Sequence, residues 1–326
     1  MKIVVVGAGS IGTKHLKNLV ELGHDVYATD INKERLCAIS TFTKGTFPSL
    51  HEALKIKPDI AFICTFSNDH IIPSIECAKA GCHLFIEKPL SLNLDGIDNL
   101  IKIVNERNLI TMTGCNMRFH PAISYIHDTL NNNPDFGKRL WANLEFGFYL
   151  PFDKEDYESS YKANRSMGGN LIFDGIHELD YAVWFFGEPA EVICNKSILS
   201  SLKIDTEDHV EMIIKFKAGS VCTIHMDYLQ HGYSRRCKIV CEGGTIVWDF
   251  AQGNIGIINS DKEWNWKEMK LGIYENQMYT DEVRYFFDCV TSHKETFNSA
   301  EESLSILKLA LAADKSSHTN VWEGIE

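Results

Sequence analysis

A glycine-rich turn near the N-terminus is the first segment whose spacing suits chemistry. Gly7-Ala8-Gly9-Ser10-Ile11-Gly12 follows a β-branched apolar run and precedes a helical pattern. In such a strand–turn–helix unit the first glycine allows the turn, the second lets the backbone approach a pyrophosphate, and the third lets helix and strand pack closely. The phosphates would lie on the free N–H groups of the helix N-terminus. The segment therefore predicts a dinucleotide site, with a plain tight turn as the alternative.

Asp30 lies at the end of the second predicted strand, 18 residues after Gly12. A carboxylate there accepts hydrogen bonds from the adenosine ribose hydroxyls and repels a 2′-phosphate, so the sequence predicts NAD in preference to NADP. Lys33 and Arg35 lie close by in the sequence, and their positive charges weaken the argument against NADP. Asp30 as the N-cap of the next helix is an alternative interpretation, and both roles are compatible.

Two further segments carry groups suited to proton transfer. Lys88, in the tripeptide Glu87-Lys88-Pro89, follows a predicted strand at the carboxyl edge of the sheet, where the nicotinamide would lie; a solvated surface charge is the alternative. Asp174 precedes His177 by three residues in a predicted helix, so the carboxylate could orient the imidazole as a general base. A surface Asp–His pair is the alternative there.

The same helix has two contrasting faces. Asp174, His177, Glu178 and Tyr181 share one stripe, which we expect to face a cleft or solvent. The opposite stripe is apolar and should pack on the core; it comprises Ile172, Ile176, Leu179, Val183 and Phe186.

The first part of the chain alternates strands and helices. Strands are predicted at residues 2–6, 24–29, 59–64, 83–86 and 109–113, separated by segments of helical length. This alternation predicts a doubly wound parallel α/β sheet, the Rossmann fold, over residues 1–118.

The rhythm changes over residues 119–326. Helices are predicted at 121–130 and 169–186, and strands at 138–149, 190–197, 208–217, 220–229, 235–241 and 245–250, the last five joined by short turns. This pattern predicts an α+β substrate-binding and oligomerisation domain with a large, mostly antiparallel sheet. Two final helices, at 278–292 and 300–315, could pack back on the first domain.

Composition excludes several classes of protein. The 326 residues include 44 Asp and Glu against 32 Lys and Arg, without a long basic run, so neither nucleic acid nor a membrane is an expected partner. No signal peptide or apolar stretch long enough to span a membrane is seen, which predicts a cytoplasmic protein. The ten cysteines lack zinc-site spacing, so we expect reduced thiols and no metal.

Taken together, these segments resemble the Gfo/Idh/MocA oxidoreductase family, named after glucose-fructose oxidoreductase and inositol dehydrogenase. The resemblance spans nearly the whole chain. It is carried by the glycine turn, by Glu87-Lys88-Pro89, by Asn116-Met117-Arg118-Phe119-His120-Pro121, and by Gly168-Gly169-Asn170-Leu171-Ile172-Phe173-Asp174 with His177 and Asp180.

The resemblance implies specific roles for residues of this chain. Lys88 would touch both nicotinamide and substrate, often beside a cis peptide bond to Pro89, and Asp174 and His177 would act on the substrate hydroxyl. Cofactor contacts would come from Ser10, Ile11, Asp30, Thr65, Asn68, His70, Glu87 and Asn116, in addition to Gly7, Gly9 and Gly12. Substrate hydroxyls or phosphate could be bound by Arg118, Tyr157, Tyr161, Lys162 and Arg165, for which a solvated loop over 157–165 is the alternative.

Two departures from the family pattern matter. Asn170 replaces the usual third glycine, and the Asp-to-His spacing is three residues where better-known members have four. The shorter spacing keeps both groups on one helical face. It resembles a branch often associated with bacterial surface-sugar biosynthesis, so inositol is not implied as the substrate.

The predicted function is therefore NAD-dependent transfer of a hydride between nicotinamide and a secondary hydroxyl or ketone of a sugar, nucleotide sugar or polyol. His177 or Lys88 would accept the hydroxyl proton. One alternative is a lyase or glycosidase that uses bound NAD for transient oxidation, and another is a non-catalytic NAD-binding sensor or scaffold. Sheet packing in the family makes a homodimer or homotetramer the expected assembly.

Overall fold

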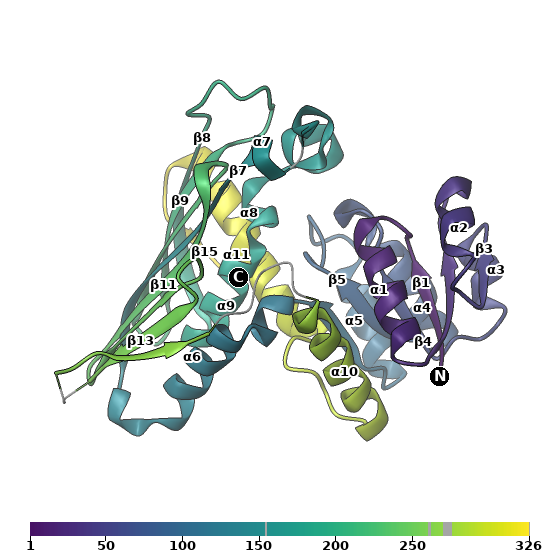
Figure 1. Ribbon diagram of the computed structural model, residues 1–326, viewed down its shortest axis with the longest axis horizontal. Coiled ribbons are helices and arrows are strands. Elements are labelled where there is room, and N and C mark those ends of the chain that lie inside the picture. The colour runs from purple at the N-terminus through teal and green to yellow at the C-terminus, as the bar shows by residue number, and fades with distance from the viewer. Residues whose placement is uncertain (154, 260–261, 270–275, 326) are drawn as a thin grey trace. The chain divides into compact units, whose positions relative to one another are not determined.

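The computed structural model describes residues 1–153, 155–259, 262–269 and 276–325 (Figure 1). The chain forms two compact units. The first unit comprises Met1–Asn116 and Asn276–Leu307, and the second comprises Met117–Glu275 and Lys308–Glu326.

The first unit is built on a six-stranded parallel sheet with the order β3-β2-β1-β4-β5-β6. Its strands are β1 (Lys2–Val6), β2 (Asp25–Thr29), β3 (Gly45–Phe47), β4 (Ile60–Ile63), β5 (His83–Glu87) and β6 (Thr111–Gly114). The predicted Rossmann fold is confirmed. Sequence patterns missed β3, because three half-buried residues carry too little periodicity to be recognised.

Helices complete the first unit. They are α1 (Ser10–Glu21), α2 (Lys33–Ile39), α3 (Leu50–Leu54), α4 (Ile71–Ala80), α5 (Ile97–Glu106) and α10 (Gln277–Ser292), with the 3₁₀ turn η1 (Ser67–Asp69). Helix α4 ends at Gly81, whose φ of 93° is the left-handed conformation expected of a residue at that place. Helix α10 packs against α1, so the distant C-terminal segment contributes to this unit.

The second unit contains a nine-stranded sheet with the order β14-β13-β12-β11-β7-β10-β9-β8-β15. Its strands are β7 (Arg139–Tyr149), β8 (Pro189–Ser197), β9 (His209–Phe216), β10 (Val221–Asp227), β11 (Leu229–Cys241), β12 (Thr245–Asp249), β13 (Asn254–Ile258), β14 (Asn265–Glu268) and β15 (Glu323–Gly324). Neighbouring strands are antiparallel except β7 and β10, which confirms the predicted sheet class.

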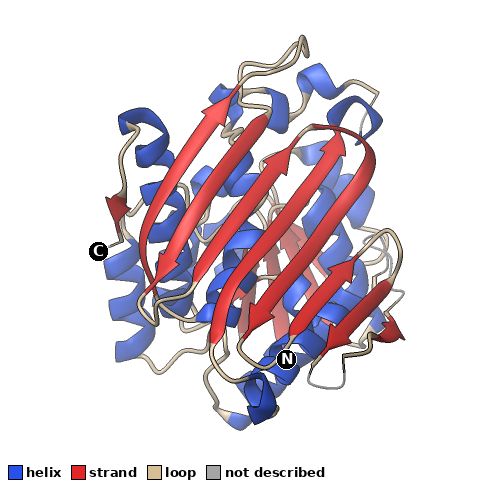
Figure 2. Ribbon diagram, turned by 90° about the vertical axis from the view of Figure 1, so that its left-hand side faces the viewer, coloured by secondary structure: helices blue, strands red, loops and turns tan. Residues whose placement is uncertain are grey.

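The two faces of this sheet differ. Along β10, Cys222, Ile224 and Met226 are fully buried, whereas Thr223 and His225 between them are partly exposed. Thr223 and His225 therefore point to one face of the sheet, which we call the open face, and the buried residues point to the other. Figure 2 views the sheet from the open face, and no helix lies in front of it there.

Helices α6 (Pro121–Asn132), α8 (Leu171–Asp174) and α9 (Ile176–Phe186) belong to the second unit. Helix α11 (Ala300–Thr319) is shared: its residues up to Leu307 belong to the first unit, and those from Lys308 belong to the second. The single helix predicted for 169–186 is broken at Gly175, which ends α8 and begins α9. A Cβ at Gly175 would lie 2.2 Å from Met226 Sδ, so a larger residue there would require the buried Met226 side chain to move. The long polar connection before α8 contains α7 (Leu150–Asp153) and the 3₁₀ turns η4 (Tyr157–Ser159), η5 (Tyr161–Ala163) and η6 (Arg165–Met167).

No helix among the described residues combines the length and apolar character needed to cross a membrane. All ten cysteines are free thiols, and nine of them are buried. The expectation that the cysteines are buried is therefore confirmed for all except Cys37, which is exposed.

Candidate active site

The glycine turn between β1 and α1 is tightly packed on one side and open on the other. A Cβ at Gly12 would lie 1.9 Å from the backbone oxygen of Gly7, and Gly7 itself has a φ of 97°. A Cβ at Gly9, by contrast, would meet only the Nη1 of the flexible Arg35 side chain, 4.0 Å away, among the described atoms beyond its chain neighbours. The turn thus needs glycine at its ends for packing and leaves room at its centre for a ligand to approach the backbone.

The N-terminus of α1 fits the phosphates of a dinucleotide. Gly9 is the N-cap, and within the described residues no side chain caps the helix and no acidic residue lies in its first turn. Ser10 and Ile11 form the start of this turn. The N–H groups of a helix N-terminus attract an anion, so these residues are suited to hold the pyrophosphate of NAD.

Asp30 lies beside this turn and is buried. Its Oδ2 accepts a hydrogen bond from the Ala8 N–H at 2.6 Å, and its Oδ1 accepts one from the Asn32 N–H at 2.7 Å. An ionised carboxylate has further acceptor sites, so ribose hydroxyls can still bind. Arg35 Nη1 lies 3.7 Å from Oδ2. The N-cap interpretation of Asp30 is wrong, because Asn32 caps α2 by accepting hydrogen bonds from the Glu34 and Arg35 N–H groups.

Thr65, Asn68 and His70 lie on the segment that follows β4. The Thr65 hydroxyl donates to the Asp69 backbone oxygen at 2.7 Å, and Asn68 lies in η1. His70 is buried, with Nδ1 2.8 Å from the Pro89 oxygen and Nε2 3.2 Å from the Thr65 oxygen. Burial lowers the pKa of His70. This imidazole therefore links the segment after β4 to the Glu87-Lys88-Pro89 tripeptide.

Glu87 at the end of β5 has a partner that the sequence analysis did not identify. His15 of α1 is fully buried, and its Nε2 lies 2.6 Å from Glu87 Oε1. Glu87 Oε2 accepts a hydrogen bond from the Lys88 N–H at 3.3 Å, and the Lys88–Pro89 peptide bond is cis, as the family resemblance implies. Asn116 is also buried and begins the turn η2 (Asn116–Phe119). The sequence does contain one indication that His15 is buried, because it lies on the apolar face of α1.

In the second unit, the break at Gly175 places Asp174 and His177 on two different helices. Asp174 is the last residue of α8, and His177 lies in the first turn of α9; both are only partly buried as residues. The Asp174 carboxylate accepts hydrogen bonds from the hydroxyls of Tyr161 (2.6 Å, to Oδ1) and Tyr228 (3.1 Å, to Oδ2).

Lys162 completes a cluster of donors around this carboxylate. Its Nζ lies 4.0 Å from Asp174 Oδ2, 2.8 Å from Asp153 Oδ2 and 4.7 Å from the centre of the Phe148 ring. Burial, together with the charge of Asp174, raises the pKa of Tyr228 well above its ordinary value, so this phenol stays protonated and donates. Sequence reasoning missed Tyr228 because strand alternation alone assigned it no role.

The expectation that the whole polar stripe of this helix faces a cleft or solvent is wrong for two of its members. Glu178 and Tyr181 are completely buried. Arg235 of β11 donates from Nε and Nη2 to the two carboxylate oxygens of Glu178, at 2.7 and 3.1 Å, and the Tyr181 hydroxyl donates to Oε1 at 2.9 Å. A cation from a distant strand compensates the buried carboxylate, which the helical periodicity could not reveal.

The remaining predicted substrate residues have other partners. Arg118 and Asp180 form a buried pair through two hydrogen bonds of 2.9 and 2.7 Å. Arg165 Nη2 lies 3.2 Å from Glu207 Oε2, and the Tyr157 hydroxyl accepts from the Lys203 N–H at 3.4 Å. Tyr161 and Lys162 are thus the two of the five that the structure brings to Asp174.

Asn170, which replaces the third glycine of the family pattern, has a structural role. Its side chain caps α8 by accepting a hydrogen bond from the Ile172 N–H at 3.0 Å. Its amide donates to Asp314 Oδ1 on α11, also at 3.0 Å. The substitution therefore anchors the start of the helix that ends at Asp174.

Comparison with known proteins adds independent information. Residues 1–115 match the oxidoreductase family with an NAD-binding Rossmann fold, and residues 130–247 match the GFO/IDH/MocA C-terminal domain. The chain is 28% identical to myo-inositol 2-dehydrogenase of Thermotoga maritima, over 97% of this chain and 96% of that protein. It is 23% identical to UDP-N-acetylglucosamine 3-dehydrogenase of Acidithiobacillus ferrooxidans, over 95% of each protein.

Solved structures resemble the fold along its full length. A probable dehydrogenase from Thermotoga maritima superposes with a TM-score of 0.84 at 25% identity, and levoglucosan dehydrogenase bound to NADH and levoglucosan superposes with a TM-score of 0.89 at 18% identity. Each alignment covers 100% of this chain and 99% of the other. Together with the two domain matches and the glycine turn, these similarities show that the chain belongs to the Gfo/Idh/MocA family of NAD-binding oxidoreductases.

Proposed function

We propose that this member of the family oxidises a secondary hydroxyl, or reduces the corresponding ketone, of a sugar, nucleotide sugar or polyol. One observation carries the proposal. Asp174 is surrounded by two phenol hydroxyls and an ammonium group, and a partly exposed histidine follows in the next helical turn. Such a set of donors and acceptors suits a substrate with several hydroxyls.

Each catalytic residue has a distinct role in this proposal. Bound NAD supplies the oxidant. His177 takes the proton from the substrate hydroxyl, Asp174 favours the cationic imidazole, and Lys88 stabilises the negative charge that develops on the substrate oxygen. Proton acceptance by Lys88 instead of His177 is the variant mechanism. Tyr161 and Lys162 are proposed to bind substrate hydroxyls, and Arg118, Tyr157 and Arg165 stay predictions from the sequence.

The names of the relatives support this substrate class. They include dehydrogenases of myo-inositol and UDP-N-acetylglucosamine, and the levoglucosan enzyme among the solved structures has the same fold. These compounds therefore form the first panel of substrates, each supplied with NAD⁺ while the absorbance of NADH is followed. Product formation without net NADH would instead indicate the lyase or glycosidase reaction that uses transient oxidation.

Replacement of His177 tests the catalytic assignment. His177→Ala should lower kcat by about 10² to 10⁴ and leave NADH affinity nearly unchanged, because the residue acts on the substrate proton. The exposed His51 of α3 provides the control: His51→Ala should retain wild-type kcat. Unchanged turnover in His177→Ala would contradict the assignment. Equal NADH binding by wild type and a Lys88→Ala/His177→Ala variant, with no turnover of any substrate by either protein, would favour a sensor or scaffold.

Fluorescence titration with NADH and NADPH tests the preference for NAD. NADH should bind more tightly, because the buried Asp30 carboxylate repels a 2′-phosphate. Asp30→Ser should narrow the difference in affinity between NADH and NADPH. The carboxylate that repels the 2′-phosphate is then gone, and Arg35 is released from its 3.7 Å contact with that carboxylate. Tighter binding of NADPH by the wild type would show that Lys33 and Arg35 outweigh Asp30.

We further propose that two copies, or four, assemble through the open face of the nine-stranded sheet. Trp141 and Ile213 lie on this face and are 40% and 38% exposed. Light scattering after gel filtration measures the mass of the assembly. Trp141→Glu should lower this mass towards that of a single chain. We also propose a cytoplasmic location, which the ten free thiols favour.

A further inference from the structure

Four ionisable side chains form a block on the open face of the nine-stranded sheet. In the antiparallel register of β9 and β10, His225 is directly opposite Glu211, and Asp227 is directly opposite His209. Their neighbours in the sequence, such as Met212 and Ile224, point into the core. Strand alternation therefore places the four polar groups on one surface, close to one another.

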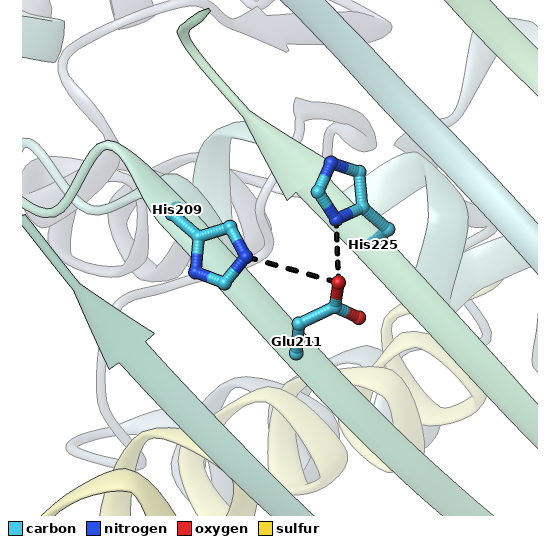
Figure 3. Close-up of side chains that lie close together, drawn as sticks. All are labelled: His209, Glu211 and His225. Carbon is cyan, nitrogen blue, oxygen red and sulfur yellow. Dashed lines mark hydrogen bonds and ion pairs between the residues drawn. The ribbon is translucent and has the colours of Figure 1, made fainter. Parts of the chain in front are cut away.

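The spacing of three of these groups suits a metal ion. His225 Nδ1 lies 2.7 Å from Glu211 Oε1, and His209 Nε2 lies 3.7 Å from the same oxygen (Figure 3). One nitrogen or oxygen atom from each of the three residues lies within 4.8 Å of the others. Tetrahedral zinc, with bonds of about 2.1 Å, holds its ligands about 3.4 Å apart. Because both separations from Glu211 are shorter than 4 Å, the widest separation is the one between the two imidazoles, and it must close by up to about 1.4 Å. The partly exposed rings of His209 and His225 would have to make this shift.

Asp227 orients one of the imidazoles as an outer-shell carboxylate does in metalloproteins. Its Oδ2 lies 2.6 Å from His225 Nε2, and its Oδ1 accepts hydrogen bonds from the Leu229 and Gln230 N–H groups, at 2.7 and 3.0 Å. A fixed carboxylate at Nε2 keeps a proton on that nitrogen, so a cation bound at Nδ1 would displace only the proton that Nδ1 donates to Glu211. This arrangement prepares His225 to bind a cation through Nδ1.

A simple ion network explains only part of the cluster. His225 between two carboxylates is satisfied without a metal. His209 is held less closely: its Nε2 lies 3.7 Å from Glu211 Oε1, an ion-pair contact that is too long for a hydrogen bond. A cation between His209, Glu211 and His225 would engage the Nε2 of His209. Glu145, in register with His225 on β7, adds negative charge nearby.

We propose that His209, Glu211 and His225 bind a divalent transition-metal ion, with Zn²⁺ as the expected ion. Two imidazole nitrogens and one carboxylate oxygen are ligands that zinc accepts readily, and the fourth position is left for water. The proposal concerns residues other than those assigned to hydride transfer, so it stands or fails separately from that reaction. The cysteine and histidine spacing in the sequence did not indicate it, because its ligands come from two strands.

Zinc content of the full chain tests the proposal. The metal is measured in the protein as purified, and again after chelation, dialysis and titration with Zn²⁺ in competition with a chromophoric chelator. Wild type should bind one Zn²⁺ per chain. Glu211→Gln, nearly isosteric at an exposed position, and His209→Gln should each weaken binding at least about tenfold. His51→Gln removes an exposed histidine elsewhere and should bind like the wild type.

Cobalt provides a second measurement that reports geometry. Co²⁺ added to the chelated wild type should give the visible absorption bands of a four-coordinate site, and these bands should be lost in Glu211→Gln and His209→Gln. Circular dichroism confirms that each variant is folded. The proposal is refuted if folded wild type binds less than stoichiometric Zn²⁺ under these conditions, or if the two ligand variants bind as tightly as His51→Gln does.

Discussion

The buried pair between Glu178 and Arg235 gives the most demanding prediction about stability. Glu178 is completely buried, and Arg235 is almost so. Burial raises the pKa of Glu178, opposed by the charge of Arg235 and its hydrogen bonds. The variant Arg235→Met removes the cation while keeping a side chain of similar length in the space. It leaves the carboxyl of Glu178 in an apolar site with only the Tyr181 hydroxyl as a side-chain hydrogen-bond donor among the contacts described above.

The expected loss is large because one partner of a buried pair remains without compensation. Breaking such a pair typically lowers the free energy of unfolding by about 3–5 kcal/mol. At about 2–4 °C for each kcal/mol in a domain of 150–250 residues, Tm should fall by on the order of 10 °C. Removing both charges, in Glu178→Gln/Arg235→Met, should recover at least about 2 kcal/mol, since neither charge is then buried alone.

Urea unfolding followed by tryptophan fluorescence measures these free energies, and Trp248, buried on β12, reports on the second unit. Arg236 supplies a matched control, because it is the next residue and pairs with Asp249 at 2.9 Å on the exposed side. Arg236→Met should cost at most about 1 kcal/mol. Equal stability of Arg235→Met and Arg236→Met would contradict the predicted role of the buried pair. The same holds if Glu178→Gln/Arg235→Met is no more stable than Arg235→Met.

Other predictions concern the cofactor turn, the candidate catalytic carboxylate and the open face. Gly12→Ala should abolish NADH binding in a fluorescence titration, because the new methyl group would lie 1.9 Å from a backbone oxygen. Tyr228→Phe removes a hydrogen bond to the Asp174 carboxylate worth about 1.5–3 kcal/mol, so kcat/KM should fall about 10- to 100-fold while NADH affinity is retained. Hydrogen bonding to Asp227 and to Glu211 raises the pKa of His225 to about 9 in the metal-free protein. Its stabilising contribution is therefore complete below its ordinary pKa of 6.5 and is lost as pH rises through 9. With a chelator present, the stability advantage of wild type over His225→Gln should shrink between pH 6.5 and pH 9; a constant difference would contradict it.

Much of the fold was predictable because it depends on local patterns. Strand and helix periodicity over residues 1–118 indicated five of the six strands of the parallel sheet, and the glycine turn was recognised from its spacing. The break at Gly175 was not predicted, because the apolar periodicity continues through it. The close neighbour that disfavours a larger residue there is Met226, which belongs to strand β10.

The sequence by itself determined the family, the order of secondary-structure elements and the residue types suited to hydride transfer, since these depend on spacing along the chain. Only the tertiary structure decided how the charged groups are paired. Asp174 with Tyr228, Glu178 with Arg235, and Glu211 with His225 each join separate elements. The reason is physical: a buried or clustered charge is stabilised by groups that are near in space, and one helix or strand read alone cannot show which groups those are.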